Sequence, residues 1–167
     1  MKKILALVLA LCMLTACALA AGSKKSGTGT VTTETEETAE VAVTLEDVSE
    51  ELLNEFAAVE APILAFSDET KAAVDTLIGG DSLALDLIEL KGIAIEGEFE
   101  GDIEMVLDFD EDFTQFNNIV GVIVANEEEM PYKMDVNEEG DLAFTLLFED
   151  AEKIVADSEA FIAILAD

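Results

Sequence analysis

The chain of 167 residues contains no histidine, no arginine and no tryptophan, and its positively charged side chains are eight lysines. Histidine is the side chain whose ordinary pKa lies near neutrality, and arginine binds carboxylates and phosphates through two parallel hydrogen bonds. Without histidine, neither Ser-His-Asp nor Cys-His catalysis can be built in this chain. We therefore expect no catalytic residues and a non-enzymatic role.

Cysteine is also scarce, and the two cysteines, Cys12 and Cys17, both lie near the N-terminus. No disulfide framework can form from them, and the absence of histidine excludes a Cys/His zinc site. Any fold must therefore depend on its hydrophobic core. Apolar residues make up 51% of the chain, whereas disorder requires low hydrophobicity together with high charge. We expect a folded domain.

Acidic residues dominate the charge. Asp and Glu number 38, the net charge at pH 7 is −30, and only four lysines follow the first acid, Glu34. Proteins bind nucleic acids and anionic lipids through Lys and Arg contacts, so we expect no nucleic-acid partner. Crowded carboxylates repel one another in the folded state. We therefore expect their pKa values to be raised on average, and the melting temperature to rise with salt or mild acidification.

The N-terminus has the pattern of an export signal. A basic head, Met1-Lys2-Lys3, precedes an apolar run over 4–14, which is shorter than the roughly 20 residues of a membrane-spanning helix. The sequence Leu14-Thr15-Ala16-Cys17 then closes the run, and it resembles the lipobox of bacterial lipoprotein precursors. The resemblance implies a signal peptide over 1–17, cleavage before Cys17, and lipid on Cys17. That lipid would anchor the protein on the outer side of the cell membrane, at the bacterial cell surface.

A second cleavage site lies directly after the first. Ala18-Leu19-Ala20 has the spacing of small residues at which secreted proteins are cut. Its use would remove Cys17 and release a soluble protein, and both alternatives predict export. Residues 18–44 are rich in Thr, Glu, Gly and Ser, so we expect a disordered tether there. Residues 45–167 are expected to form a single acidic domain.

Hydrophobic periodicity predicts an α+β fold for this domain. One helix is expected after an N-cap at Thr44, and a second between Ser67 and Gly79-Gly80. The period then changes to two, which is typical of an antiparallel sheet, here of about six strands. A C-terminal helix over 150–166 is expected to pack with the others on one sheet face. Residues 161–165 alone are also compatible with a strand.

Several strands can be placed more closely. Residues 83–90 are expected to form the first strand of the sheet, with a helix as the alternative. Hairpins are expected around Glu100-Gly101-Asp102 and around 137–141. The continuous apolar run over 119–125 predicts a central strand that is buried on both faces. The acidic run over 127–129 is interpreted as a solvated loop.

One acidic segment has part of the spacing of a calcium loop. Asp108, Asp110 and Asp112 alternate in the way that oxygen ligands of a hard cation do. Phe113 and Ile119 occupy the positions at which such a loop needs a glycine and a bidentate glutamate. A strand end followed by a solvated loop explains the segment more simply.

A second segment resembles the first half of an EF-hand or dockerin-like loop. Asp135, Asn137 and Glu139 alternate, and Gly140 fits the sixth position, but Leu146 replaces the acid at the twelfth. The flanking residues alternate as strands do, so a hairpin turn at Gly140 is the simpler interpretation. Weak Ca²⁺ binding is the most that the two segments predict, and no other cofactor is expected.

The sequence favours an exported, lipid-anchored, non-catalytic domain that binds a protein or a small ligand whose identity it does not reveal. Its expected partners are that ligand and the membrane, through the lipid on Cys17. An alternative is an acidic module that responds to calcium. A third is a hydrolase that uses carboxylates alone, but any two of the 38 acids make a pair, and a single tyrosine, Tyr132, offers little surface for stacking a sugar.

Overall fold

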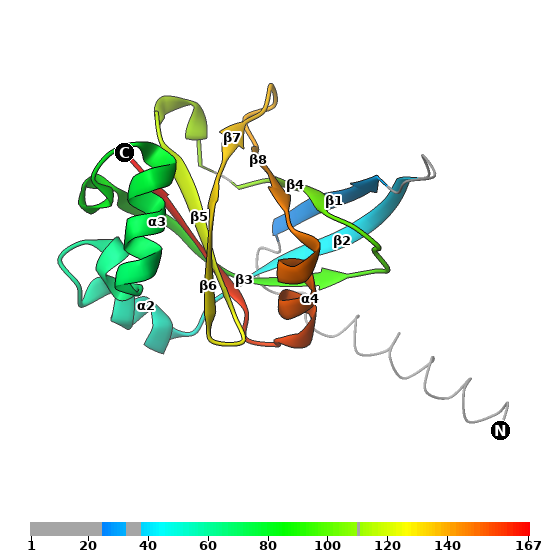
Figure 1. The fold of residues 1–167 in the computed structure, drawn as a ribbon, viewed down its shortest axis with the longest axis horizontal. Coiled ribbons are helices and arrows are strands. Elements are labelled where there is room, and N and C mark those ends of the chain that lie inside the picture. Colours follow the sequence, from blue (N-terminus) through cyan, green and yellow to red (C-terminus); the bar gives the residue numbers. More distant parts are fainter. Residues whose placement is uncertain (1–24, 33–37, 110) are drawn as a thin grey trace, which may run out of the picture.

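A computed structural model describes residues 25–32, 38–109 and 111–167, with side chains from residue 41 onward. These residues form an antiparallel sheet, which confirms the α+β class (Figure 1). The expectations of about six strands and of helices on one sheet face are wrong, because the described sheet has nine strands and helices on both sides. Three short 3₁₀ helices, η1 to η3, lie in the connections. The elements are β1 (Lys25–Thr32), β2 (Thr38–Asp47), α2 (Glu50–Ala57), η1 (Pro62–Ala65), α3 (Asp68–Ile78), η2 (Ser82–Ala84), β3 (Asp86–Glu96), β4 (Ile103–Leu107), η3 (Phe113–Gln115), β5 (Ile119–Ala125), β6 (Glu128–Lys133), β7 (Asp135–Val136), β8 (Leu142–Leu146), α4 (Phe148–Ala156) and β9 (Phe161–Ala166).

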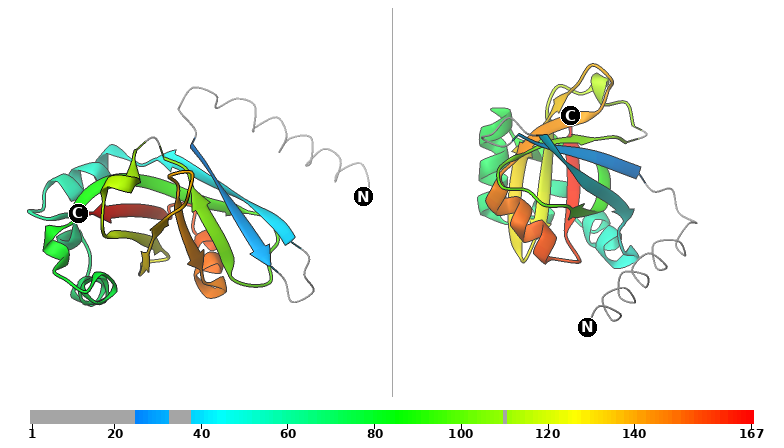
Figure 2. Two further views of the ribbon diagram at one scale, coloured as in Figure 1. Left: turned by 90° about the horizontal axis from the view of Figure 1, so that it is seen from above. Right: turned by 90° about the vertical axis from the view of Figure 1, so that its right-hand side faces the viewer.

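The nine described strands lie in the order β6-β5-β9-β3-β2-β1-β4-β8-β7. Each pair of neighbours is antiparallel. The sheet is strongly twisted, and it curls over one of its faces (Figure 2). Because of this curl, β6 and β8 contact each other although they are far apart in the strand order. The curled face encloses the largest part of the core.

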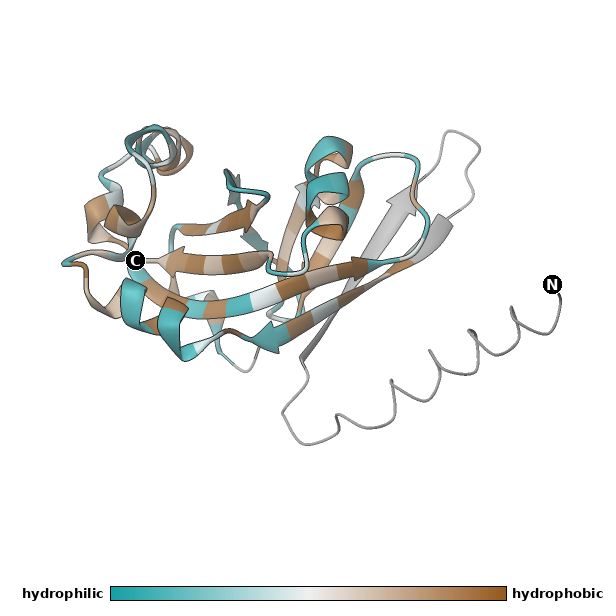
Figure 3. Ribbon diagram, turned by 90° about the horizontal axis from the view of Figure 1, so that it is seen from below, coloured by the Kyte–Doolittle hydropathy of each residue, from teal (hydrophilic) through white to brown (hydrophobic). Residues whose placement is uncertain are grey.

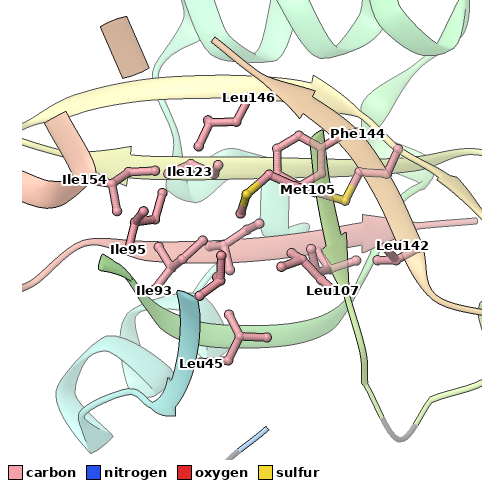
Figure 4. Packing of buried hydrophobic residues seen from close by; sticks show 14 of the residues in the cluster. Leu45, Ile93, Ile95, Met105, Leu107, Ile123, Leu142, Phe144, Leu146 and Ile154 are labelled. Carbon is pink, nitrogen blue, oxygen red and sulfur yellow. The ribbon is translucent and has the colours of Figure 1, made fainter. Parts of the chain in front are cut away.

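The main core lies inside the curl, and α4 covers it. Figure 4 shows side chains from β2, β3, β5 and α4, among them Leu45, Ile93, Ile123 and Ile154, pointing toward one another. Two smaller apolar clusters lie on the outer face, under α2, α3 and η1. Figure 3 shows that hydrophobic residues gather on the strands, whereas hydrophilic residues gather on the helices and connections.

Strand β5 is buried on both faces, as its apolar run predicts. Ile119 and Ile123 face the main core, whereas Val120 and Val122 face the cluster under α3. The alternation of side chains along a strand sends successive residues into the two layers. Val124 is the one half-buried residue of this strand.

The structure differs from the expectation of a disordered tether over 18–44. Its described residues form β1 and the first part of β2, while 18–24 and 33–37 lie outside the described residues. In β2, Val41, Val43 and Leu45 are buried and alternate with more exposed residues. Val and Thr favour strands, so the alternation from Val41 onward is the signal that a reading of overall composition missed.

The two N-terminal helices are present, but the first starts later than predicted. Thr44 lies within β2, and the N-cap of α2 is Ser49, whose hydroxyl accepts the N–H of Leu52 at 3.3 Å. The N-cap of α3 is Ser67, as predicted, and its hydroxyl accepts the N–H of Thr70 at 3.2 Å. Gly79 ends α3 with a left-handed φ of 65°, a conformation that glycine adopts without steric cost.

The hairpin predicted around Glu100-Gly101-Asp102 is wrong. β3 pairs with β2 and β9, whereas β4 pairs with β1 and β8, so β1 and β2 lie between the two strands. The hairpin around 137–141 is confirmed, because Asp135 and Val136 pair with Ala143 and Leu142.

Three further boundaries differ from the predictions. The first strand after α3 begins at Asp86 and extends to Glu96, and η2 precedes it. The acidic run over 127–129 is not a loop throughout, since Glu128 and Glu129 begin β6, which pairs with β5. The C-terminal segment divides into α4 and then β9, which agrees with the alternative of a strand over 161–165.

Candidate functional site

Two acids of the first predicted calcium segment, Asp108 and Asp112, lie in the described part of the chain, and neither belongs to a group there that could hold a metal ion. Asp108 is exposed, and the carboxylate of Asp112 accepts the backbone N–H of Thr114 at 3.0 Å, which caps η3. The hydroxyl and the N–H of Thr114 lower the pKa of Asp112. Asp110 lies outside the described residues.

The second predicted calcium segment is a turn that is satisfied by its own hydrogen bonds. The Asn137 side-chain oxygen accepts the N–H groups of Glu139 and Asp141, each at 2.9 Å, while Asp135 lies in β7. Across the described part of the chain, no three His, Cys, Asp or Glu residues are grouped so that they could hold a metal ion.

The leader and the predicted lipidation site, Cys17, lie outside the described residues. Among the helices that are described, none is both long enough and apolar enough to cross a membrane.

A partly buried polar cluster joins β6 to α4. The Tyr132 hydroxyl donates to the Asp150 carboxylate, and Lys153 contacts both Asp150 at 3.0 Å and Glu128 at 2.7 Å. Burial, and then the hydrogen bond to Asp150, raises the pKa of Tyr132. The lysine is held charged by its two carboxylates, so the cluster ties two elements together and presents no free nucleophile.

The candidate site is an acidic hollow beside α2. It has a volume of about 490 Å³ and lies between the N-terminal part of α2, the end of β2, and the segment before β9. Its lining contains carboxylates and, among the described residues, no lysine. The carboxylates are those of Glu46, Asp47, Glu51, Glu55 and Glu159.

An apolar groove adjoins the acidic hollow. It has a volume of about 420 Å³ and lies between α2, the end of η1 and the end of β5. Leu52, Glu55 and Phe161 line both spaces, so they form the boundary between them. The apolar lining of the groove comes from Leu52, Phe56, Val59, Phe66, Val124 and Phe161.

Three phenylalanine rings fix the floor of the apolar groove. Phe56 on α2 meets Phe66 and Phe161 edge-on, with ring centroids 5.4 Å and 6.3 Å apart. Such edge-to-face pairs are favoured over a face-to-face sandwich of rings. Phe56 is buried, whereas Phe66 and Phe161 are half-buried, so these two rings hold α2 on the sheet and still face the groove.

Local sequence signals place the acids of the hollow but not the phenylalanine rings at the floor of the adjoining groove. Glu51 and Glu55 are four residues apart, and side chains at that spacing share one face of a helix. Phe161 reaches the site only because β9 inserts between β5 and β3, more than 100 residues along the chain from α2. Sequence reasoning missed this site, since a choice between helix and strand over 161–165 was needed to find it.

We found no family model that matches the chain, and no curated protein or solved structure that matches it.

Proposed function

We propose that the chain is an exported, lipid-anchored, non-catalytic surface domain that binds a positively charged ligand in the acidic hollow beside α2. Export and the anchor are supported by the leader and by its lipobox-like Cys17. Binding is supported by one observation, the lining of the hollow by five carboxylates and, among the described residues, by no lysine.

Charge complementarity favours a cationic ligand over an anionic or neutral one. An anion would enter a space whose charged lining is entirely acidic, and like-charge contacts in a cleft cost several kcal/mol. A lysine or arginine side chain would instead pair with carboxylates such as those of Glu51, Glu55 and Glu159, whereas Asp47 already pairs with Lys91 at 2.7 Å. The net charge of −30 adds a long-range attraction that speeds encounter with a cation.

The experiment is a fluorescence-anisotropy titration of the protein with labelled hexalysine. The variant Glu51→Gln/Glu55→Gln removes two charges from the hollow, and we expect binding to weaken about fivefold, because exposed ion pairs contribute up to about 1 kcal/mol. The matched control is Glu138→Gln/Glu139→Gln, which removes two charges from the turn between β7 and β8. Equal losses in both variants would show attraction to the net charge alone and would overturn the proposal.

The calcium alternative is tested by calorimetry on the same protein. The absence of both binding heat and a shift in melting temperature at millimolar Ca²⁺ would rule out this alternative.

A further inference from the structure

We propose that the ligand is an amphipathic cationic peptide, in which a lysine or arginine enters the acidic hollow and a neighbouring apolar side chain fills the groove. This inference rests on the proposed function, because it names the ligand of the same site. It goes further in assigning the apolar groove an occupant.

The two spaces are adjacent. Leu52, Glu55 and Phe161 line both, so a cation bound among the carboxylates and an apolar group in the groove would lie on either side of the same three side chains. A ligand that carries both groups on adjacent or alternate residues therefore reaches both spaces at once. A small polyamine would fill the acidic hollow and leave the groove in water.

The groove leaves apolar surface exposed. Val124 lies on β5, a strand otherwise covered on both faces, yet it remains half-buried because it opens onto the groove. The volume of the groove, about 420 Å³, lies within the usual range of ligand pockets, about 300–1,000 Å³. Covering such apolar surface is favourable in proportion to the area removed from water.

The rim of the groove carries two carboxylates. Glu55 and Glu129 are the two charged residues that line the groove. The Glu129 carboxylate already accepts hydrogen bonds from Ser67. A purely apolar ligand would remove the Glu55 carboxylate from water without a partner, which is costly. A ligand with a cation beside its apolar group supplies that partner, so charge and apolar area together point to an amphipathic cation.

The experiment compares two labelled hexapeptides of equal charge, KLKLKL and KSKSKS, by fluorescence anisotropy on the unaltered protein. We expect KLKLKL to bind about tenfold more tightly, because burial of one leucine side chain is sufficient for such a difference. Equal affinities would overturn the inference but leave the proposed function standing. No binding of either peptide, or of hexalysine, would overturn both.

A variant that fills the groove locates the effect. Ala65 is exposed, ends η1 and lines the groove, so Ala65→Phe is expected to remove the advantage of KLKLKL and leave KSKSKS binding unchanged. The matched control is Ala84→Phe, at the exposed end of η2, which lines neither space. An advantage that survives in Ala65→Phe would overturn the assignment to this groove. Val59→Ser is the second variant, with the same expected outcome, should Ala65→Phe fail to fold.

Discussion

Glu129 shows how a single acid in this crowded chain can stabilise the fold. Ser67, the N-cap of α3, donates its N–H at 3.0 Å and its hydroxyl at 2.7 Å to one carboxylate oxygen of Glu129. The N-terminus of a helix favours negative charge. Burial alone would raise the pKa of Glu129, but hydrogen bonds from Thr70 and Ser67 outweigh it, so the pKa is lowered.

The variant Glu129→Gln is expected to destabilise the protein by about 1 kcal/mol at neutral pH, because it keeps the shape but loses the charge at the helix end. A lowered pKa in the folded state means that the contribution is present above the ordinary value of 4.5. It is then lost as the pH falls through the folded pKa. Urea denaturation of both proteins should therefore show a difference at neutral pH that is smaller at an acidic pH below the ordinary value of 4.5.

The control is Glu138→Gln, which removes one charge from an exposed position in the turn between β7 and β8. It corrects for the general relief of repulsion that any lost acid brings. A Glu129→Gln deficit that is the same at both pH values would show that the effect comes from packing and not from the charge.

At the scale of elements, the turn between β5 and β6 joins the hairpin to the end of α4. The Asn126 N–H donates to the carboxylate of Asp157 at 2.7 Å, and its side-chain amide donates to the Lys153 carbonyl oxygen at 3.1 Å. Both turn residues have positive φ, 51° for Asn126 and 64° for Glu127. Two-residue turns of this kind favour Asn-Gly, so Glu127 is the residue with a steric cost.

The variant Glu127→Gly is expected to stabilise the protein by about 0.5–1 kcal/mol. Relief of the left-handed conformation exceeds the entropy that glycine adds to the unfolded chain. The measurement is urea denaturation at neutral pH. Glu127→Ala is the control, because it removes the same charge but keeps a Cβ atom at positive φ. Equal stabilisation by both variants would assign the gain to charge and not to the backbone.

The elements also show which parts of the fold could be predicted. Ser67 and Gly79 bound α3, and 137–141 forms a hairpin, because these signals act between residues close in sequence. β1 and β2 separate β3 from β4 through pairings that no local pattern specifies. The candidate site divides in the same way: helical spacing predicts Glu51 and Glu55 on one face, but only the strand order brings Phe161 beside them.

At the scale of the whole molecule, carboxylates outnumber the cations that could compensate them. Among the described side chains, Lys71, Lys91 and Lys153 each lie within 4 Å of two carboxylates, and the sequence holds 38 acids against eight lysines. Repulsion among these acids is the unfavourable term, and salt screens it. The expectation of rising stability in salt therefore stands as a prediction.

The expected effect of acidification on stability is different, because the described carboxyl groups with shifted pKa values have lowered and not raised ones. The Ser82 hydroxyl beside Asp75 and the Ser82 N–H, with Lys71, lower the pKa of Asp75 to about 2. A lowered folded pKa gives stability that is lost as the pH falls from the ordinary value towards the folded one. The other groups with lowered pKa values are Asp112, Glu129, Asp157 and Asp167.

We therefore expect salt and acid to act in opposite directions on the melting temperature. At neutral pH the melting temperature should rise by several degrees between about 0.01 M and about 1 M NaCl, as the screening length falls from about 30 Å to about 3 Å. KCl at the same ionic strength should give the same rise, because screening does not depend on the cation. Below about pH 4 the melting temperature should fall, since the hydrogen-bonded carboxylates become protonated. A melting temperature that is flat or falling in salt would mean that the acids are compensated by contacts other than lysines. A melting temperature that still rises below pH 4 would mean that relief of charge repulsion stabilises the fold more than the loss of these hydrogen bonds destabilises it.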